Sequence, residues 1–123
     1  MNIYFEIHVD DTTRAVAFYR AVFNWKFTEV PGLPIAYWSI EADGSWGGLL
    51  KRPAHAPAPE QGANAFVCSL EVADFDQTAE LIMKNGGMVA LPKFAVPNKC
   101  WQGYFLDTEG NVFGLFQVDP NAK

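Results

Sequence analysis

The chain has 123 residues, of which 50% are hydrophobic and 15% aromatic, and its formal net charge is -5. This length is typical of one domain with a real core, and the composition argues against disorder. The negative charge disfavours nucleic acid and anionic membranes as partners. No apolar run reaches the roughly 20 residues of a membrane helix, and from the start MNIYFEIHV, which enters a strand at once, we expect no secretory signal. We expect Cys68 and Cys100 to be buried free thiols, as in a cytoplasmic protein.

The first 50 residues predict a strand, a helix and three further strands. Residues 4–9 alternate between apolar and polar side chains, which is the period of a half-buried strand. Asp11 can cap the helix that follows, and Asn24 can end it in a left-handed conformation. The apolar stripe of this helix comprises Ala15, Phe18, Tyr19 and Val22. The three further strands are expected over residues 25–30, 36–41 and 46–50, with a hairpin turn at Asp43-Gly44.

Two adjacent glycines, Gly47 and Gly48, fall inside the last of these strands. Glycine weakens a strand, so the pair indicates either a bulge or a group held close to the backbone. Residues 51–64, rich in proline and alanine, then read as a semi-rigid linker near the midpoint of the chain.

The second half repeats the pattern of the first. Strands are expected over residues 65–72, 88–96, 100–106 and 112–118, and a helix capped by Asp74 follows the first of them. The apolar stripe of that helix comprises Phe75, Ala79, Ile82 and Met83. We expect the last five residues to be frayed.

The two halves therefore predict an α+β protein built from two βαβββ modules. Module one covers about residues 1–50 and module two about residues 65–118, within a single domain over residues 1–123. A repeat this long indicates two copies of one supersecondary unit that bury a surface together.

Two runs of the sequence resemble a known family. FEIHVDDTTRAVAFYRAVFNW is similar to the opening of the vicinal oxygen chelate superfamily, which includes glyoxalase I, bleomycin resistance proteins and extradiol dioxygenases. FLDTEGNVFGLFQ is similar to the closing strand of that family, with Thr108 in place of the usual proline. The resemblance implies two curled mixed sheets, a half-barrel pair, around a central trough. It also implies a homodimer, because such domains commonly pair through sheet edges or by sharing modules.

The resemblance also implies where metal ligands would lie. In metal-dependent members they come from the first and last strand of each module, and here those positions hold Tyr4, Gly48, Val67 and Gly114. A divalent ion needs imidazole or carboxylate ligands, so we expect no metal and no other cofactor. The ending FGLFQ also resembles that of antigen-like, metal-free relatives.

Candidate functional residues are those that the two modules would place in the trough. Glu6, His8 and Glu71 are candidates for general acid–base chemistry, because a carboxylate beside an imidazole tunes its proton affinity. The candidate ligand-binding residues are Tyr4, Trp38, Trp46, Gly48, Leu50, Ser69, Trp101, Tyr104, Gly114 and Phe116.

Each of these assignments has an alternative. Glu6 and His8 can simply satisfy one another, or form a displaced metal site with Glu71. The tryptophans can be core residues rather than ligand contacts, and the glycines can either leave room for a substrate ring or only allow close packing. His55, in the linker, is either solvated or part of a mobile lid.

Three functions remain open from the sequence. The first is a metal-free binder of a small aromatic or planar molecule, for which the acidic charge favours cationic ligands. The second is a lyase, isomerase or dioxygenase that uses Glu6, His8 and Glu71. The third is a non-catalytic interaction domain.

Overall fold

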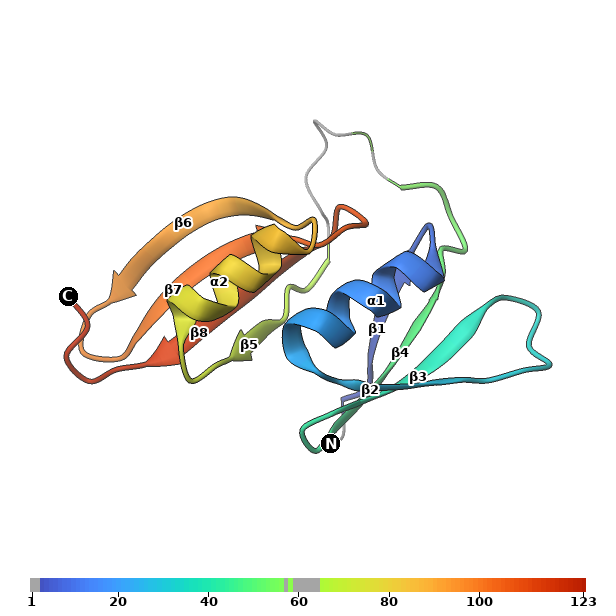
Figure 1. The fold of residues 1–123 in the computed structure, drawn as a ribbon, viewed down its shortest axis with the longest axis horizontal. Helices are drawn as coiled ribbons and strands as arrows, with labels where there is room; N and C mark the ends of the chain where they lie inside the picture. Colours follow the sequence, from blue (N-terminus) through green and yellow to red (C-terminus); the bar gives the residue numbers. More distant parts are fainter. Residues whose placement is uncertain (1–2, 57, 59–64) are drawn as a thin grey trace. The chain divides into compact units, whose positions relative to one another are not determined.

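The computed structural model describes residues 3–56, 58 and 65–123, and the chain divides into two compact units, Met1–Gln61 and Gly62–Lys123 (Figure 1). Among the described residues each unit has four strands and one helix in the order βαβββ, which confirms the predicted α+β class. Part of the expected linker, residues 57 and 59–64, lies outside the described residues. No helix in the described ranges is long and apolar enough to cross a membrane.

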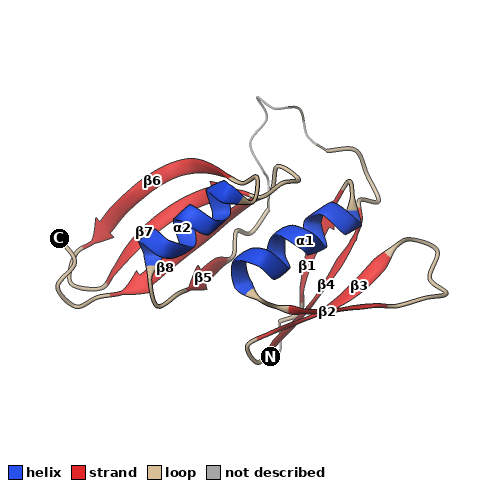
Figure 2. Ribbon diagram, viewed as in Figure 1, coloured by secondary structure: helices blue, strands red, loops and turns tan. Residues whose placement is uncertain are grey.

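Unit 1 is a mixed four-stranded sheet with one helix against it (Figure 2). Its elements are β1 (Phe5–Val9), α1 (Thr12–Phe23), β2 (Lys26–Glu29), β3 (Tyr37–Ala42) and β4 (Ser45–Lys51). The strand order is β1-β4-β3-β2, with β1 parallel to β4 and the other pairs antiparallel. The parallel pairing of β1 and β4 follows from the connection between them, because α1 and two strands carry the chain back across the sheet.

The core of unit 1 is the predicted one. The Asp11 carboxylate accepts a hydrogen bond from the backbone N–H of Arg14 at 3.0 Å, and Asn24 ends α1 with a φ of 57°. The four residues of the predicted stripe are buried, together with Val9, Ile40 and Leu49 from the sheet. Trp25 stacks on Tyr19 with ring centroids 5.4 Å apart. The paired glycines cause no bulge, since β4 keeps a regular register with both neighbours.

Unit 2 repeats this topology. Its elements are β5 (Ser69–Glu71), α2 (Phe75–Lys84), β6 (Met88–Val96), β7 (Cys100–Leu106) and β8 (Val112–Val118), with the strand order β5-β8-β7-β6. The expected strand over residues 65–72 is too long, because only three residues pair with β8. Phe66 is fully exposed, so apolar character alone overstated the strand.

The second helix contradicts one part of its predicted stripe. Asp74 caps α2 through the backbone N–H of Gln77 at 3.0 Å, and Phe75 and Ile82 are buried as expected. Met83 is 51% exposed, so its assignment to the stripe is wrong. Neighbouring helical positions differ by about 100°, and Ile82 takes the place facing the sheet.

Two further expectations are corrected. The cysteines are free, as expected, but neither is buried. Cys68 is exposed because it lies before β5 rather than inside a strand, and Cys100, the first residue of β7, is only partly buried. The last residues form an ordered turn instead of a frayed end. Ala122 is buried, and its carbonyl accepts a hydrogen bond from the backbone N–H of Asn98 at 2.9 Å.

Candidate functional site

Each sheet has a face that packs on its helix and an opposite face, which we call the distal face. In unit 1 the strand alternation turns Phe5 and Val9 toward α1, so Glu6 and His8 lie on the distal face. Register places further residues there, because Glu6 pairs with Gly48 and His8 pairs with Leu50. The same registers place Tyr4, Glu6, His8, Tyr37, Ser39, Trp46, Gly48 and Leu50 on the distal face of unit 1, together with Glu41, Lys26 and Thr28 toward its β2 edge.

Glu6 is the centre of a hydrogen-bonded cluster on this face. Its Oε1 lies 3.1 Å from Nε2 of His8, and its Oε2 accepts a hydrogen bond from the Tyr4 hydroxyl at 3.1 Å. The Tyr4 hydroxyl lies 2.5 Å from that of Tyr37. The structure thus brings together three predicted site residues and a fourth, Tyr37, that the sequence analysis missed. The alternation of residues 36–41 contained the signal, because a strand that turns Ile40 toward the helix turns Tyr37 to the opposite face.

The Tyr4 phenol keeps its proton. Partial burial, together with its hydrogen bonds to Tyr37 and Glu6, raises the pKa of Tyr4 above its ordinary value. A phenol must lose its proton to bind a metal ion strongly, so this environment works against Tyr4 as a ligand.

The space above Gly48 is filled by these hydroxyl groups. A Cβ atom at Gly48 would collide with the hydroxyl of Tyr4 and would lie 2.5 Å from that of Tyr37. Gly48 therefore allows close packing of two phenols, and it does not leave room for a substrate ring.

The distal face of unit 2 is built in the same way around Gly114. Ser69 pairs with Gly114, and the Gln102 amide donates a hydrogen bond to the Ser69 hydroxyl at 3.3 Å. A Cβ atom at Gly114 would collide with Ser69 and would lie 2.9 Å from the Gln102 amide nitrogen. Register adds Tyr104, which pairs with Gly114. Gln102 is the residue that the sequence analysis missed in this unit.

Phe116 and Glu71 are two further candidate residues on the distal face of unit 2. Phe116 pairs with both Glu71 and Gln102, so all three share the distal face. Glu71 is exposed, and it ends β5. Unlike Glu6 in unit 1, Glu71 has no histidine beside it on its strand.

The predicted tryptophans divide between the two faces. Trp46 pairs with Glu41, lies on the distal face and is 60% exposed. Trp38 lies on the face that α1 covers, with the Arg20 guanidinium 5.7 Å from its ring centroid. Trp38 also lines an open cavity of about 300 Å³ formed by residues 29–38 with Thr12 and Thr13. The structure does not bring Trp38 together with Glu6 and His8.

Trp101 lies on the helix side of the sheet in unit 2. The Lys93 ammonium lies 4.8 Å from its ring centroid and 3.1 Å from a carboxylate oxygen of Asp76. The indole N–H of Trp101 donates a hydrogen bond to Asp119 at 2.9 Å, and Asn121 N–H also binds that carboxylate. The hydrogen bond from Asn121 has the larger effect and the one from Trp101 the smaller, and both lower the pKa of Asp119. Trp101 is thus a packed structural residue rather than part of the distal face.

The residues at the ligand positions implied by the resemblance do not fit a metal ion. Gly48 and Gly114 have no donor atom, and Val67 has only an apolar side chain. In the described part of the chain, no group of three His, Cys, Asp or Glu residues is placed to hold a metal. His55 is exposed and lies outside the strands.

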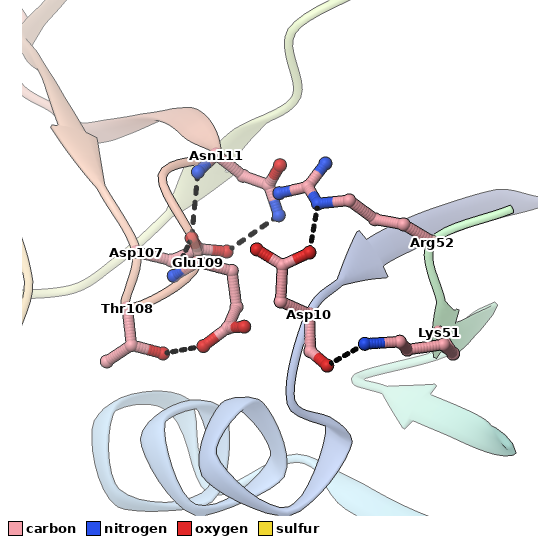
Figure 3. A network of polar contacts seen from close by, with 7 residues as sticks. All are labelled: Asp10, Lys51, Arg52, Asp107, Thr108, Glu109 and Asn111. Carbon is pink, nitrogen blue, oxygen red and sulfur yellow. Dashed lines mark hydrogen bonds and ion pairs between the residues drawn. The ribbon is translucent and has the colours of Figure 1, made fainter. Parts of the chain in front are cut away.

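Each unit has a polar network at a turn or at the end of a strand (Figure 3). In unit 2 the buried Asp107 carboxylate accepts hydrogen bonds from the backbone N–H groups of Glu109 and Asn111, both at 2.8 Å, and from the Asn111 amide at 3.1 Å. In unit 1 the Asp10 carboxylate accepts a hydrogen bond from Arg52 at 3.1 Å, and the Asp10 carbonyl accepts one from Lys51 at 2.6 Å. These contacts fix turns and strand ends.

Comparisons with known proteins identify a family and a fold. The family model of the Glyoxalase/Bleomycin resistance protein/Dioxygenase superfamily matches residues 3–115. The comparison with curated protein sequences gives no match.

Solved structures with the same fold include relatives of low identity. A hypothetical protein from S. aureus is 21% identical and has a TM-score of 0.74, over 96% of this chain and 97% of that one. A glyoxalase/bleomycin resistance protein/dioxygenase family enzyme from Burkholderia phytofirmans PsJN is 23% identical and has a TM-score of 0.73, over 94% of this chain and 97% of that one. The fosfomycin resistance protein FosX from Listeria monocytogenes, in complex with Mn(II) and sulfate, is 15% identical and has a TM-score of 0.75, over 97% and 90%.

Proposed function

This chain belongs to the glyoxalase/bleomycin resistance protein/dioxygenase superfamily, and on that premise we propose that it is a metal-free binding protein for a small planar or aromatic molecule. The ligand would contact the distal face of a sheet. The candidate contacts there are Tyr4, Trp46 and Leu50 in unit 1, and Ser69, Tyr104 and Phe116 in unit 2.

The main support for this proposal is that other side chains fill the space above Gly48 and Gly114. The family resemblance places metal ligands at Gly48 and Gly114, and in this chain uncharged hydroxyl and amide groups fill the space above both. These groups give the distal faces hydrogen-bonding capacity without the anionic ligands that a divalent ion requires. FosX, in contrast, is a relative whose structure contains Mn(II).

Ligand screening with a metal analysis tests the proposal. Protein purified without chelator is expected to contain no stoichiometric transition metal, and chelator treatment should leave its affinity for planar aromatic compounds unchanged. Trp46→Ala should weaken binding, because an exposed indole offers a large stacking surface. Absence of any aromatic binder would remove the proposed function. One equivalent of Fe, Ni, Zn or Mn would show that the metal site was misplaced.

The contact between Glu6 and His8 supports a second candidate, a lyase, isomerase or dioxygenase. A carboxylate 3.1 Å from an imidazole can tune it for proton transfer, with Glu71 as a further carboxylate. If the protein is such an enzyme, His8→Ala should abolish turnover while the thermal midpoint stays close to that of the unaltered protein. Turnover that survives in His8→Ala would exclude this mechanism.

The proposal extends to assembly and location. We propose a homodimer, and light scattering coupled to size exclusion would show twice the mass of one chain. A monomer across the micromolar range would contradict it. Two unpaired cysteines suit a reducing compartment, which supports a cytoplasmic location.

A further inference from the structure

The hydrogen bonds around Glu6 have a determined direction. An ionised carboxylate has only lone pairs, so Tyr4 must donate its single hydroxyl proton to Glu6. Tyr4 can then only accept from Tyr37, which makes Tyr37 the donor of the hydrogen bond between the two phenols. The other Glu6 oxygen lies against Nε2 of His8, whose N–H is the donor there. The protons of Tyr4 and of His8 Nε2 therefore point to Glu6, and the proton of Tyr37 points to Tyr4.

This direction leaves hydrogen-bond acceptors as the groups that the cluster can offer to a ligand. The Tyr37 oxygen has used its proton on Tyr4 and retains lone pairs, as does each carboxylate oxygen of Glu6. Ser39 continues this pattern, since it pairs with Gly48 on the same face and its hydroxyl donates to the backbone carbonyl of Thr28 at 3.4 Å. The cluster can thus satisfy ligand N–H groups, and it would repel an anion through Glu6.

An exposed indole lies on the same face of the sheet. Trp46 is two residues from Gly48 on β4, so strand alternation places it on the side of Tyr37 and Glu6. Indole is the aromatic side chain that attracts a cation most strongly over its ring face. Because 60% of Trp46 is exposed, a planar cation could stack on it.

We propose that the distal face of unit 1 selects a planar organic cation that carries N–H donors, with Trp46 as the stacking surface and Tyr37 and Glu6 as the acceptors. This inference rests on the proposed binding function and narrows its ligand class. Tyr37 would determine specificity, because its oxygen can accept a hydrogen bond from a ligand N–H group but has no proton left to donate to a ligand acceptor. The net charge of -5 would favour the approach of such a cation.

Three fluorescent probes of similar size test this inference. Proflavine is a planar cation with amine N–H groups, acridine orange is the same ring system with those amines methylated, and anthracene-9-carboxylate is a planar anion. In fluorescence polarisation titrations of the unaltered full chain, proflavine should bind at least tenfold more tightly than anthracene-9-carboxylate. Acridine orange should fall between them, because it keeps the charge and loses the amine donors.

Variants locate the site. Glu6→Gln preserves the shape of the side chain and removes the charge, so proflavine should bind about tenfold more weakly, as for a lost hydrogen bond to a charged group. Tyr37→Phe should weaken proflavine several-fold and leave acridine orange nearly unchanged. Glu80→Gln, on the exposed surface of α2, is the matched control for charge and should change neither affinity.

Each outcome separates the inference from the proposed function. If none of the three probes binds, the binding function itself fails. If the anion binds as tightly as proflavine, aromatic binding stands and the selection for cations is wrong. Proflavine binding that is unchanged in both Glu6→Gln and Tyr37→Phe would place the site elsewhere. The comparison of probes on unaltered protein does not depend on the folding of any variant.

Discussion

The substitution Gly48→Ala tests the packing of the phenol pair directly. No positive φ is required at Gly48, so its backbone accepts alanine, and the new methyl group would occupy the space that the hydroxyls of Tyr4 and Tyr37 now fill. Both phenols must move, which separates Tyr4 from Tyr37 and from Glu6. We therefore expect the variant to fold, to lose stability and to lose the hydrogen-bonded cluster.

The expected loss of stability is a difference between two opposing effects. Overpacking costs about 1–3 kcal/mol, and the lower part of that range applies because the colliding atoms are the ends of partly exposed side chains. Replacing a strand glycine by alanine returns roughly 0.5–1 kcal/mol by restricting the unfolded chain. With about 1.5 kcal/mol for overpacking, the net destabilisation is about 0.5–1 kcal/mol. For a chain of this length it corresponds to a fall of roughly 2–5 °C in the thermal midpoint.

Calorimetry and urea unfolding on a double-mutant cycle measure this effect. In a Tyr37→Ala background one of the two colliding side chains is gone and Tyr4 has space to move, so Gly48→Ala should cost clearly less than in the unaltered protein. An equal cost in both backgrounds would refute the reasoning. So would a Gly48→Ala protein as stable as the original, because the hydroxyls would then not lie above Gly48.

Three further substitutions probe the structural contacts of unit 2. Asp107→Ala removes an acceptor that receives three hydrogen bonds in a buried turn, and urea unfolding should show a loss of about 2–4 kcal/mol, whereas a surface-like change below about 0.5 kcal/mol would contradict the burial. Lys93→Met keeps the aliphatic stem and removes the cation above Trp101, so we expect a loss of about 1 kcal/mol and a shifted tryptophan emission, and an unchanged spectrum would exclude the contact. Asp119 has a lowered pKa in the folded state, so its contribution to stability is present above the ordinary carboxyl pKa of about 3.9 and is lost as the pH falls through the folded value. Asp119→Asn should therefore be less stable than the original at pH 7 and equal to it near pH 2, and a difference that persists in acid would show another cause.

Local patterns in the sequence determined the elements of this protein. The caps Asp11 and Asp74 and the left-handed Asn24 act on backbone groups only a few residues away, so their roles follow from short spacings. Strand alternation likewise assigned Glu6 and His8 to one face correctly, since that assignment needs only a period of two. The repeated βαβββ order, and with it the fold, was available from these local signals.

Tertiary structure alone decided which side chains meet. Tyr4 and Tyr37 are 33 residues apart, and only the pairing of β1 and β3 with β4 brings their hydroxyls together above Gly48. The same registers placed Trp38 under α1 and left Trp46 on the distal face. Composition could not distinguish these two tryptophans, because the face that a residue occupies depends on cross-strand register and a shift of one residue would exchange them. The chemistry of the site therefore follows from contacts between strands, whereas the strands themselves follow from the sequence.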